Sequence, residues 1–314
     1  MKIKDLLSKY GIVIILFVLV AVFGIGNSTF FTVSNFINII RQISIIAIIT
    51  VGMSCVLISG GIDLSVGSQL AFIGVITATL STKLEVNPMF SCLVGIIIAT
   101  LIGIINGIFI SSTKVPPLIA TLATQRILSG FAYIISEGKP LYGLDDSVKV
   151  FGQGYVGAVP VPVIIMIVCL IVGLFILNKT YIGRSFYVIG SSEEVGRLSG
   201  IKTKLMTTTA YGICGFMCGI ASIIMMARIN SGSPTVGTGY EMDVLTAAVV
   251  GGVSVNGGEG KLFGAMIGAL IIGVLSNGLI IMNVSEYYQM VCKGLVLAFA
   301  VAFDSIKNRK LQAA

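Results

Sequence analysis

Long apolar stretches recur along most of this chain, and short polar turns separate them. A helix of about 20 apolar residues spans the hydrocarbon core of a bilayer. About ten runs approach that length: 11–30, 43–59, 66–80, 90–110, 118–136, 161–177, 207–227, 243–255, 262–282 and 287–303. Only 11% of the 314 residues are charged, too few for the water-facing surface of a soluble domain. The sequence therefore predicts an all-α membrane protein with about ten transmembrane helices and a single domain, residues 1–314.

Two of these runs, 66–80 and 243–255, are short for a full crossing. Irregular backbone at membrane depth is tolerated only where protein buries it or where it lines a cavity. Each of these runs is therefore expected to be either a short full helix or a half-helix enclosed by the others.

The distribution of Lys and Arg predicts the orientation, because cytoplasmic loops carry an excess of these residues. With the N-terminus inside, most basic residues fall in inner loops, and the basic C-terminus also returns to the cytoplasm. The outer loops receive fewer: Arg41, Lys83, Lys139, Lys149 and Arg228. The net charge of +7 thus follows from topology, and no basic stretch interleaved with aromatic residues points to nucleic acid.

Residues 1–30 share a basic start and an apolar stretch with secretory signal peptides. The apolar stretch is long for a signal peptide and lacks a clear small-residue cleavage site. A retained first helix is therefore favoured over a cleaved signal.

The composition offers few residues that could serve in catalysis or metal binding. The chain has no His, and its six Cys lie inside apolar runs, where they act as small hydrophobic residues. Cys214 and Cys218 share a helix face, but no His or carboxylate stands beside them, which disfavours a metal site. No segment matches G-x-x-x-x-G-K-[ST], not even the glycine-rich stretch 249–261. No catalytic residue, metal ligand, cofactor or ATP site is therefore expected on this chain.

The segment 60–68, GGIDLSVGS, places a carboxylate, hydroxyl groups and glycines between two apolar runs. Glycines let the backbone unwind, and the freed amides and Asp63 would then face a solute, an ion or a helix end. The alternative is a cytoplasmic turn in which Asp63 or Ser65 caps the next helix. The residues alone support the two interpretations about equally.

Two charged residues fall within the predicted spans. Arg126 lies deep enough to require a polar cavity, a carboxylate or carbonyl groups, and functional and structural roles are evenly matched for it. Lys293 lies nearer a span end and is expected to be structural, with Glu286 two turns away on a similar face.

Glycines spaced four apart recur inside the apolar runs and let helices approach closely in lipid. We expect three such pairs to mark helix packing: Gly103/Gly107, Gly215/Gly219 and Gly264/Gly268.

The inner segment 178–206 is the most charged part of the chain and a candidate docking surface. Within it, 190–201 is predicted to form a short helix that Ser191 or Ser192 caps and Gly200 ends. Acidic residues suit its first turn and a basic residue its last. The helix would present a small apolar edge: Val195, Leu198 and Ile201. Such an edge suits a partner's groove better than open cytosol.

With these motifs in place, the chain resembles the ribose-type sugar permeases of bacterial ABC importers over nearly its whole length. The most specific motif is GGIDLSVGS at 60–68. The others follow in the same order: Asn106-Gly107, Val115-Pro116-Pro117 with Thr121-Leu122 and Thr124, Arg197-Leu198-Ser199-Gly200-Ile201, Gly237-Thr238-Gly239-Tyr240-Glu241, and Gly251-Gly252 with Gly257-Gly258.

The resemblance implies a permease of the bacterial cytoplasmic membrane that pairs with a second permease copy. It would receive a simple sugar such as ribose from an extracytoplasmic binding protein, and a separate ATP-binding subunit would hold ATP and Mg. The inner helix would be the coupling helix to that subunit: Glu193, Glu194, Val195, Gly196, Arg197, Leu198, Ser199, Gly200 and Ile201. Residues expected near the translocation path or the substrate are Asp63, Ser65, Arg126, Gly239, Tyr240 and Glu241.

Two other functions stay open at this point. An ion-coupled secondary transporter of a small polar solute would suit glycine-broken segments around Gly60 and Gly257, but few membrane carboxylates and no His leave little to bind a driving ion. An intramembrane enzyme is disfavoured because no paired carboxylates or Cys/His arrangement lies at membrane depth. The residues also leave open which sugar is carried and whether the permease pair is a homodimer or a heterodimer.

Overall fold

The computed structural model describes residues 3–312, with the side chains of 11–302 and 304. Over this part of the chain the fold is helical apart from one small hairpin, so the predicted all-α class is confirmed. In chain order the elements are α1 (Ile3–Gly26), η1 (Ser28–Phe31), α2 (Val33–Ile58), α3 (Val66–Thr82), α4 (Pro88–Thr113), α5 (Pro117–Ser136), α6 (Asp146–Gln153), β1 (Tyr155–Val156), β2 (Val159–Pro160), α7 (Val161–Lys179), α8 (Tyr181–Ser191), α9 (Glu193–Leu198), α10 (Thr203–Ile229), α11 (Tyr240–Val250), α12 (Leu262–Ile281) and α13 (Glu286–Gln312).

Six of the described helices are long and apolar enough to cross a membrane: α2, α4, α5, α7, α10 and α12. Helices α3 and α11 have only 17 and 11 residues. The elements expected at 66–80 and 243–255 are therefore short helices, although the second begins earlier than predicted and ends at Val250. Each is preceded by a non-helical segment, 59–65 before α3 and 230–239 before α11.

Helices α2 and α10 form the centre of the bundle. In their most apolar stretches 83% of the residues are buried, against 22% in α5 and α7, which lie at the periphery. Helix α10 packs most extensively on α4, where a side chain at Gly103 or Gly215 would overlap the backbone of the facing helix. Likewise, Gly264 and Gly268 of α12 pack on α11. The three glycine pairs thus mark helix contacts, as predicted.

Helix α2 begins at Val33, well before the start of the predicted run at residue 43. The hydroxyl of Thr32 caps it by accepting from the backbone amide of Asn35. Arg41, expected in an outer loop, therefore lies inside this helix. Its guanidinium group donates to the carbonyl of Gln153 at 2.7 Å and lies 4.7 Å from the ring centroid of Tyr155. Those contacts let a cation occupy an otherwise apolar run.

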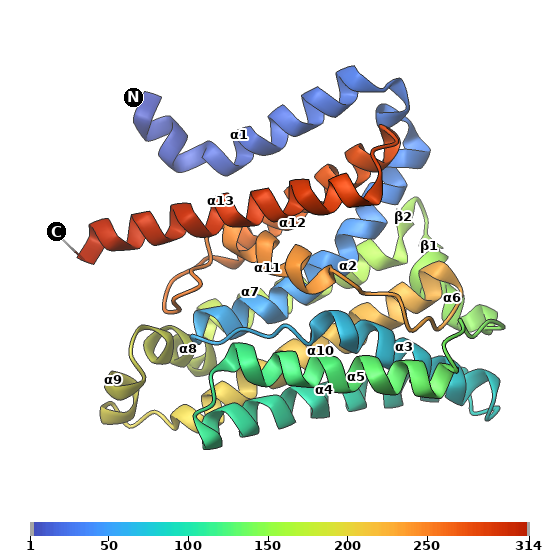
Figure 1. The fold of residues 1–314 in the computed structure, drawn as a ribbon, viewed down its shortest axis with the longest axis horizontal. Helices are drawn as coiled ribbons and strands as arrows, with labels where there is room; N and C mark the ends of the chain where they lie inside the picture. The colour runs from blue at the N-terminus through green and yellow to red at the C-terminus, as the bar shows by residue number, and fades with distance from the viewer. Residues whose placement is uncertain (1–2, 313–314) are drawn as a thin grey trace.

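Arg228, also expected in an outer loop, lies inside α10, which continues to Ile229. The non-helical residues after it run back into the molecule, with Ser231 and Ser233 buried. In Figure 1 this orange segment enters from the end that carries α6, whereas the blue segment before α3 enters from the opposite end. The two half-helices are thus reached from opposite ends of the bundle.

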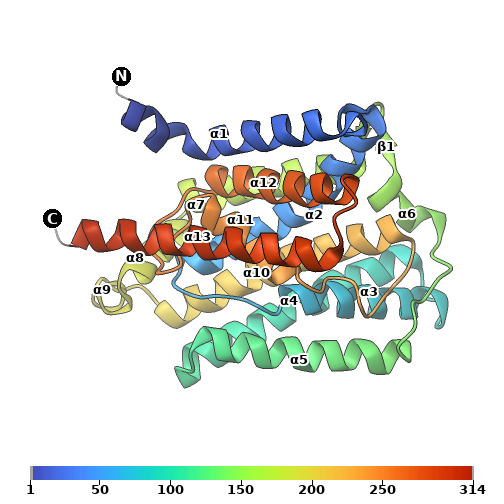
Figure 2. The same ribbon diagram turned by 45° about the horizontal axis from the view of Figure 1, so that its top comes forward.

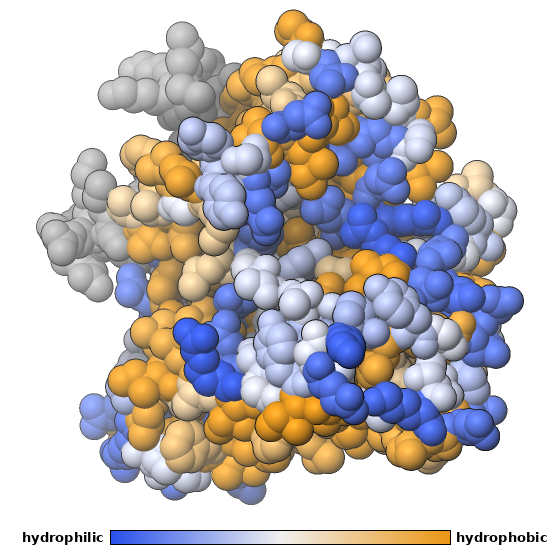
Figure 3. Space-filling model, turned by 45° about the vertical axis from the view of Figure 1, so that its right-hand side comes forward, coloured by the Kyte–Doolittle hydropathy of each residue, from blue (hydrophilic) through white to orange (hydrophobic). Residues whose placement is uncertain are grey.

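The two ends of the bundle carry different elements. Both chain termini lie at the same end as α8 and α9, and α6 with the hairpin lies at the other end (Figures 1 and 2). Helix α6 and the hairpin fall in the stretch 137–160 between α5 and α7. Figure 3 brings this second end forward and shows hydrophilic side chains across it, with hydrophobic ones along the lower flank.

Helix α13 packs mainly on α11 and is held there by an ion pair. The Nζ atom of Lys293 donates to Oδ2 of Asp243 at 2.7 Å. The expected pairing of Lys293 with Glu286 is therefore wrong, because the nearer carboxylate belongs to a helix distant in sequence. The structural role predicted for Lys293 agrees with this contact.

Candidate functional site

The motif GGIDLSVGS forms a buried polar turn at the start of α3. Gly60 has φ +85, which lets the chain reverse direction after α2. The Oδ1 atom of Asp63 accepts from the amide of Ser65 at 2.9 Å and from its hydroxyl at 2.5 Å. Both residues are 0% exposed, and Ser65 makes no side-chain cap bond to α3. Ser65 therefore does not cap α3, and the side-chain bond at the start of this helix is the one that Asp63 accepts from the amide of Ser65.

Side chains from three helices extend this turn into a network, here called the polar cluster: Asp63, Ser65, Gln69, Asn106, Thr121 and Thr124. The hydroxyl of Ser65 accepts from Gln69 at 2.9 Å and from Asn106 at 3.2 Å. Thr124 of α5 donates to Asn106 of α4 at 2.6 Å. Thr121 accepts from the amide of Leu64 at 3.2 Å. The non-helical segment before α3 is thus tied to both α4 and α5.

Two oxygen atoms of this cluster have spare hydrogen-bonding capacity. Within the described part of the chain, Oδ2 of Asp63 and Oε1 of Gln69 are buried and accept no hydrogen bond. Most buried polar atoms are paired, so these two acceptors are free to bind a further donor.

A second group of polar atoms lies at the start of α11. Gly239 precedes this helix with φ +84, a conformation that suits glycine, and Tyr240 packs partly buried against the main core. The Oε1 atom of Glu241 accepts from Nε2 of Gln125 in α5 at 3.1 Å. Successive residues of α5 thus reach the two groups, because Thr124 contacts the polar cluster and Gln125 contacts Glu241.

Arg126, the next residue of α5, is not brought into either group. It lies on the exposed face of the helix, and among the described residues no hydrogen bond or ion pair involves it. A cation on an apolar helix surface requires a polar partner or water outside this chain.

The predicted inner helix forms as α9. The hydroxyl of Ser192 caps it by accepting from the amide of Val195, and both acidic residues of its first turn face its positive end. Gly200 follows with φ +79 and ends the helix. The buried Gly196 lies against Ile189 of α8, where a larger side chain would crowd it. The helix prediction is thus confirmed.

The predicted apolar edge of α9 is only partly free. Leu198 is 76% and Val195 54% exposed, whereas Ile201 packs against the main core. Two of the three predicted edge residues therefore lie open to a partner.

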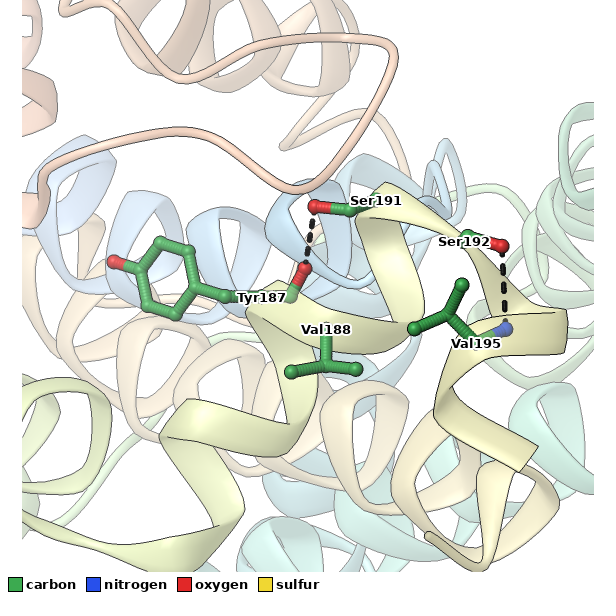
Figure 4. Close-up of a pocket in the computed structure, with 5 residues that line it drawn as sticks. All are labelled: Tyr187, Val188, Ser191, Ser192 and Val195. Carbon is green, nitrogen blue, oxygen red and sulfur yellow. Dashed lines mark hydrogen bonds between the residues drawn. The ribbon is translucent and has the colours of Figure 1, made fainter. Parts of the chain in front are cut away.

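A pocket of about 320 Å³ opens between α8 and α9, lined by Tyr187, Val188, Ser191, Ser192 and Val195. Figure 4 shows both serine hydroxyls turned toward backbone atoms, Ser191 to the carbonyl of Tyr187 and Ser192 to the amide of Val195. The hydroxyl of Tyr187 donates to the carbonyl of Gly260 at 2.9 Å, and burial raises the pKa of this phenol. With these polar groups engaged, the pocket presents mainly apolar walls.

Five residues of the two polar groups had no predicted role: Gln69, Asn106, Thr121, Thr124 and Gln125. Asn106, Thr121 and Thr124 stand in motifs of the family resemblance, and each of the five is an uncharged polar residue within or beside an apolar run. Such residues at membrane depth were the available signal. Their spacing along the chain gave no sign that they meet.

Two half-helices that enter an apolar bundle from opposite ends, with polar groups gathered beside their first turns, define a multi-pass membrane transport protein. Residues 35–301 match the family described as the permease component of branched-chain amino acid transport systems, and the chain belongs to this family.

Curated relatives match over nearly their full length. The chain is 41% identical over 301 residues to the ribose import permease protein RbsC of Haemophilus influenzae, which covers 95% of this chain and 93% of that protein. It is 39% identical over 309 residues to RbsC of Escherichia coli K12, covering 97% and 96%. It is also 37% identical over 304 residues to the L-arabinose transport system permease protein AraH of that strain, covering 96% and 92%. No solved structure matches the chain.

Proposed function

We propose that this chain is the membrane-spanning permease subunit of an ABC importer for a simple sugar, ribose or a similar monosaccharide. The observation that carries the proposal is the match to ribose import permeases at 38–41% identity over at least 95% of this chain. Although the family takes its description from amino acid transport, the relatives named above are named for sugars.

The proposed topology has ten crossings with both termini in the cytoplasm. Eight crossings would be single helices: α1, α2, α4, α5, α7, α10, α12 and α13. The other two would each combine a non-helical segment with a short helix, 59–65 with α3 and 230–239 with α11. The common end of the termini and α9 supports this arrangement, because the basic-residue bias also puts them on one side (Figure 1).

Helix α9 would dock on a separate ATP-binding subunit, which would hold ATP and Mg. Its exposed Leu198 and Val195, next to the apolar pocket, suit a protein partner. Closure of that subunit would then shift the permease between two arrangements, because one of them would bind the closed form better.

The binding protein and the second permease copy would bind other surfaces of this chain. The end that carries α6 and the hairpin would receive the sugar-loaded extracytoplasmic binding protein. A second permease copy would cover the exposed face of α5, so that Arg126 would lie on a polar path between copies. Asp63, Ser65, Gly239, Tyr240 and Glu241 would position the elements that line or border that path.

The double substitution Arg197→Glu with Leu198→Asp tests the docking role. We expect it to abolish ATP-dependent ribose uptake and co-purification with the ATP-binding subunit, while membrane insertion is unchanged. The matched control is Lys83→Glu with Leu84→Asp, an adjacent basic and apolar pair that is exposed on the α3–α4 turn. The control should keep the ATP-binding subunit bound. Normal uptake by the α9 variant would refute the docking role.

An ion-coupled secondary transporter is the second candidate, because paired half-helices also occur in such proteins. Uptake that survives ATP depletion but collapses with an ionophore would favour that candidate. Uptake that stops with ATP depletion and persists with the ionophore would exclude it.

A further inference from the structure

The first turns of α3 and α11 meet inside the bundle, where the two non-helical segments 59–65 and 230–239 end. Gly67 is the second residue of α3, and Gly237 precedes α11 by a few residues. A side chain on Gly67 would overlap the carbonyl of Gly237 and the carboxylate of Glu241. One on Gly237, where φ is +89, would overlap the carbonyl of Gly67. The backbone of α3 is therefore in direct contact with the backbone of the segment that leads into α11.

Neither half-helix has a side-chain cap. Ser65 and Gly239 occupy the cap positions, and neither supplies a side-chain hydrogen bond to the helix that follows. In α11 the backbone amides of Tyr240 and Met242 donate to the carbonyls of Gly237 and Gly239. The start of each helix carries a partial positive charge from the helix dipole.

The carboxylate of Glu241 lies where it serves both helix ends. Glu241 is itself the second residue of α11, and its Oε2 atom lies against Gly67 at the same position of α3. Its Oε1 atom accepts from Gln125 of α5 at 3.1 Å. The Glu241 carboxylate thus lies between α3, α5 and α11: Oε1 is hydrogen-bonded to α5, and Oε2 lies beside the first turn of α3 without a hydrogen bond.

The contact between α3 and Glu241 lies where the two non-helical segments end. The segment 59–65 enters from the α9 end and 230–239 from the α6 end, and both stop here (Figure 1). A link between their helices transmits displacement of one segment to the other, because half-helices joined at their first turns move together.

We propose that Glu241 is a positioning residue of the transport cycle, whose carboxylate clamps α11 to α3 and α5 so that the inner and outer re-entrant segments move as one unit. The proposal rests on the proposed function for its transport readout. It assigns no sugar contact to Glu241, because Oε2 is buried within the protein.

Three variants separate the parts of the clamp. Glu241→Gln removes the charge and keeps an acceptor for Gln125, whereas Gln125→Leu removes the hydrogen bond and keeps the charge. The swap Gln125→Glu with Glu241→Gln restores a carboxylate–amide hydrogen bond while moving the charge to α5. Glu286→Gln is the matched control, because Glu286 also stands in the first turn of a helix, α13, and lies outside this contact.

The variants are assayed in the full transporter, with its ATP-binding subunit and binding protein, in proteoliposomes supplied with radiolabelled D-ribose. We expect Glu241→Gln to lower the maximal rate of ATP-driven uptake about tenfold, which corresponds to about 1.4 kcal/mol. The KM for the sugar-loaded binding protein should change less than about twofold, because loss of a transition-state interaction alone lowers the rate without altering ground-state binding. We expect the swap to recover part of the rate.

A second measurement, hydrogen exchange on the purified permease, needs no substrate. Glu241→Gln should raise the exchange of amides 66–69 and 240–243 together, and Glu286→Gln should leave both unchanged. If Glu241→Gln raised exchange in α11 alone, the clamp would be refuted. It would also be refuted if Glu241→Gln transported ribose at the wild-type rate. Failure of both Glu241→Gln and the swap to fold would overturn the transport role and leave a purely structural residue.

The two proposals fail in different ways. If the wild-type assembly shows no ATP-driven uptake of ribose, allose or arabinose, the proposed function fails. The exchange measurement still decides the clamp in that case, because it depends only on the contact between α3 and α11.

Discussion

The ion pair between Lys293 and Asp243 gives a direct test of how α13 is attached. The two charged atoms lie 2.7 Å apart, and the side chains are 26% and 10% exposed. Removal of one partner from a buried pair leaves an uncompensated charge and costs about 3–5 kcal/mol. Because the Lys293 side chain is 26% exposed and therefore not fully buried, we expect a cost near the lower end of this range, about 3 kcal/mol, for Lys293→Met.

Thermal unfolding of the detergent-purified permease measures this cost. At about 2–4 °C per kcal/mol for large domains, Lys293→Met should lower the Tm by about 6–12 °C. Asp243→Asn should have a similar effect. The double variant should be less destabilised than the sum of the two single variants, because it leaves no unpaired charge.

Glu286→Gln is the control, since Glu286 is the partner that the sequence pattern suggested for Lys293. We expect its Tm to equal that of the wild type. Additive effects in the double variant, or a larger loss of stability in Glu286→Gln than in Asp243→Asn, would refute the assignment of this pair.

Two further predictions concern helix packing and capping. Gly103→Leu should greatly reduce the folded fraction seen by size-exclusion chromatography, because a side chain there overlaps the backbone of α10, whereas Gly294→Leu meets open space and should fold normally; equal yields would contradict the α4–α10 contact. Asp145 caps α6, and hydrogen bonds from Ser147 lower the pKa of its carboxyl group. The cap should therefore be fully formed above the unfolded pKa of about 3.9. It should be lost as the pH falls through the lower pKa of the folded protein. Amide exchange at Ser147 should follow this pH dependence, and Asp145→Asn should abolish it; an identical pH profile in both proteins would argue against the cap.

Local features of this protein were predictable because they depend on neighbouring residues. The helix α9 follows from the cap at Ser192, the acidic first turn and the stop at Gly200, all within a few residues. The short helices α3 and α11 follow from the length of their apolar runs. The glycine pairs of α4 and α10 also marked helix contacts, since close approach in lipid requires small residues.

Errors arose where a segment's environment depends on distant parts of the chain. The residues 230–239 are polar and rich in glycine, as an outer loop would be, yet they enter the bundle because surrounding helices bury them. Arg41 lies within α2, where its guanidinium group is stabilised by a hydrogen bond to the carbonyl of Gln153 and by a cation–π contact with the ring of Tyr155.

The sequence by itself determined that this chain is helical, membrane-embedded and related to sugar permeases, because hydrophobic length, capping and motif order are written along the chain. Only the tertiary structure decided which polar groups meet: Thr124 with Asn106, Gln125 with Glu241, and Lys293 with Asp243. Hydrogen bonds and ion pairs act over a few ångströms, so partners from different helices are chosen by how the helices pack and not by spacing in the sequence.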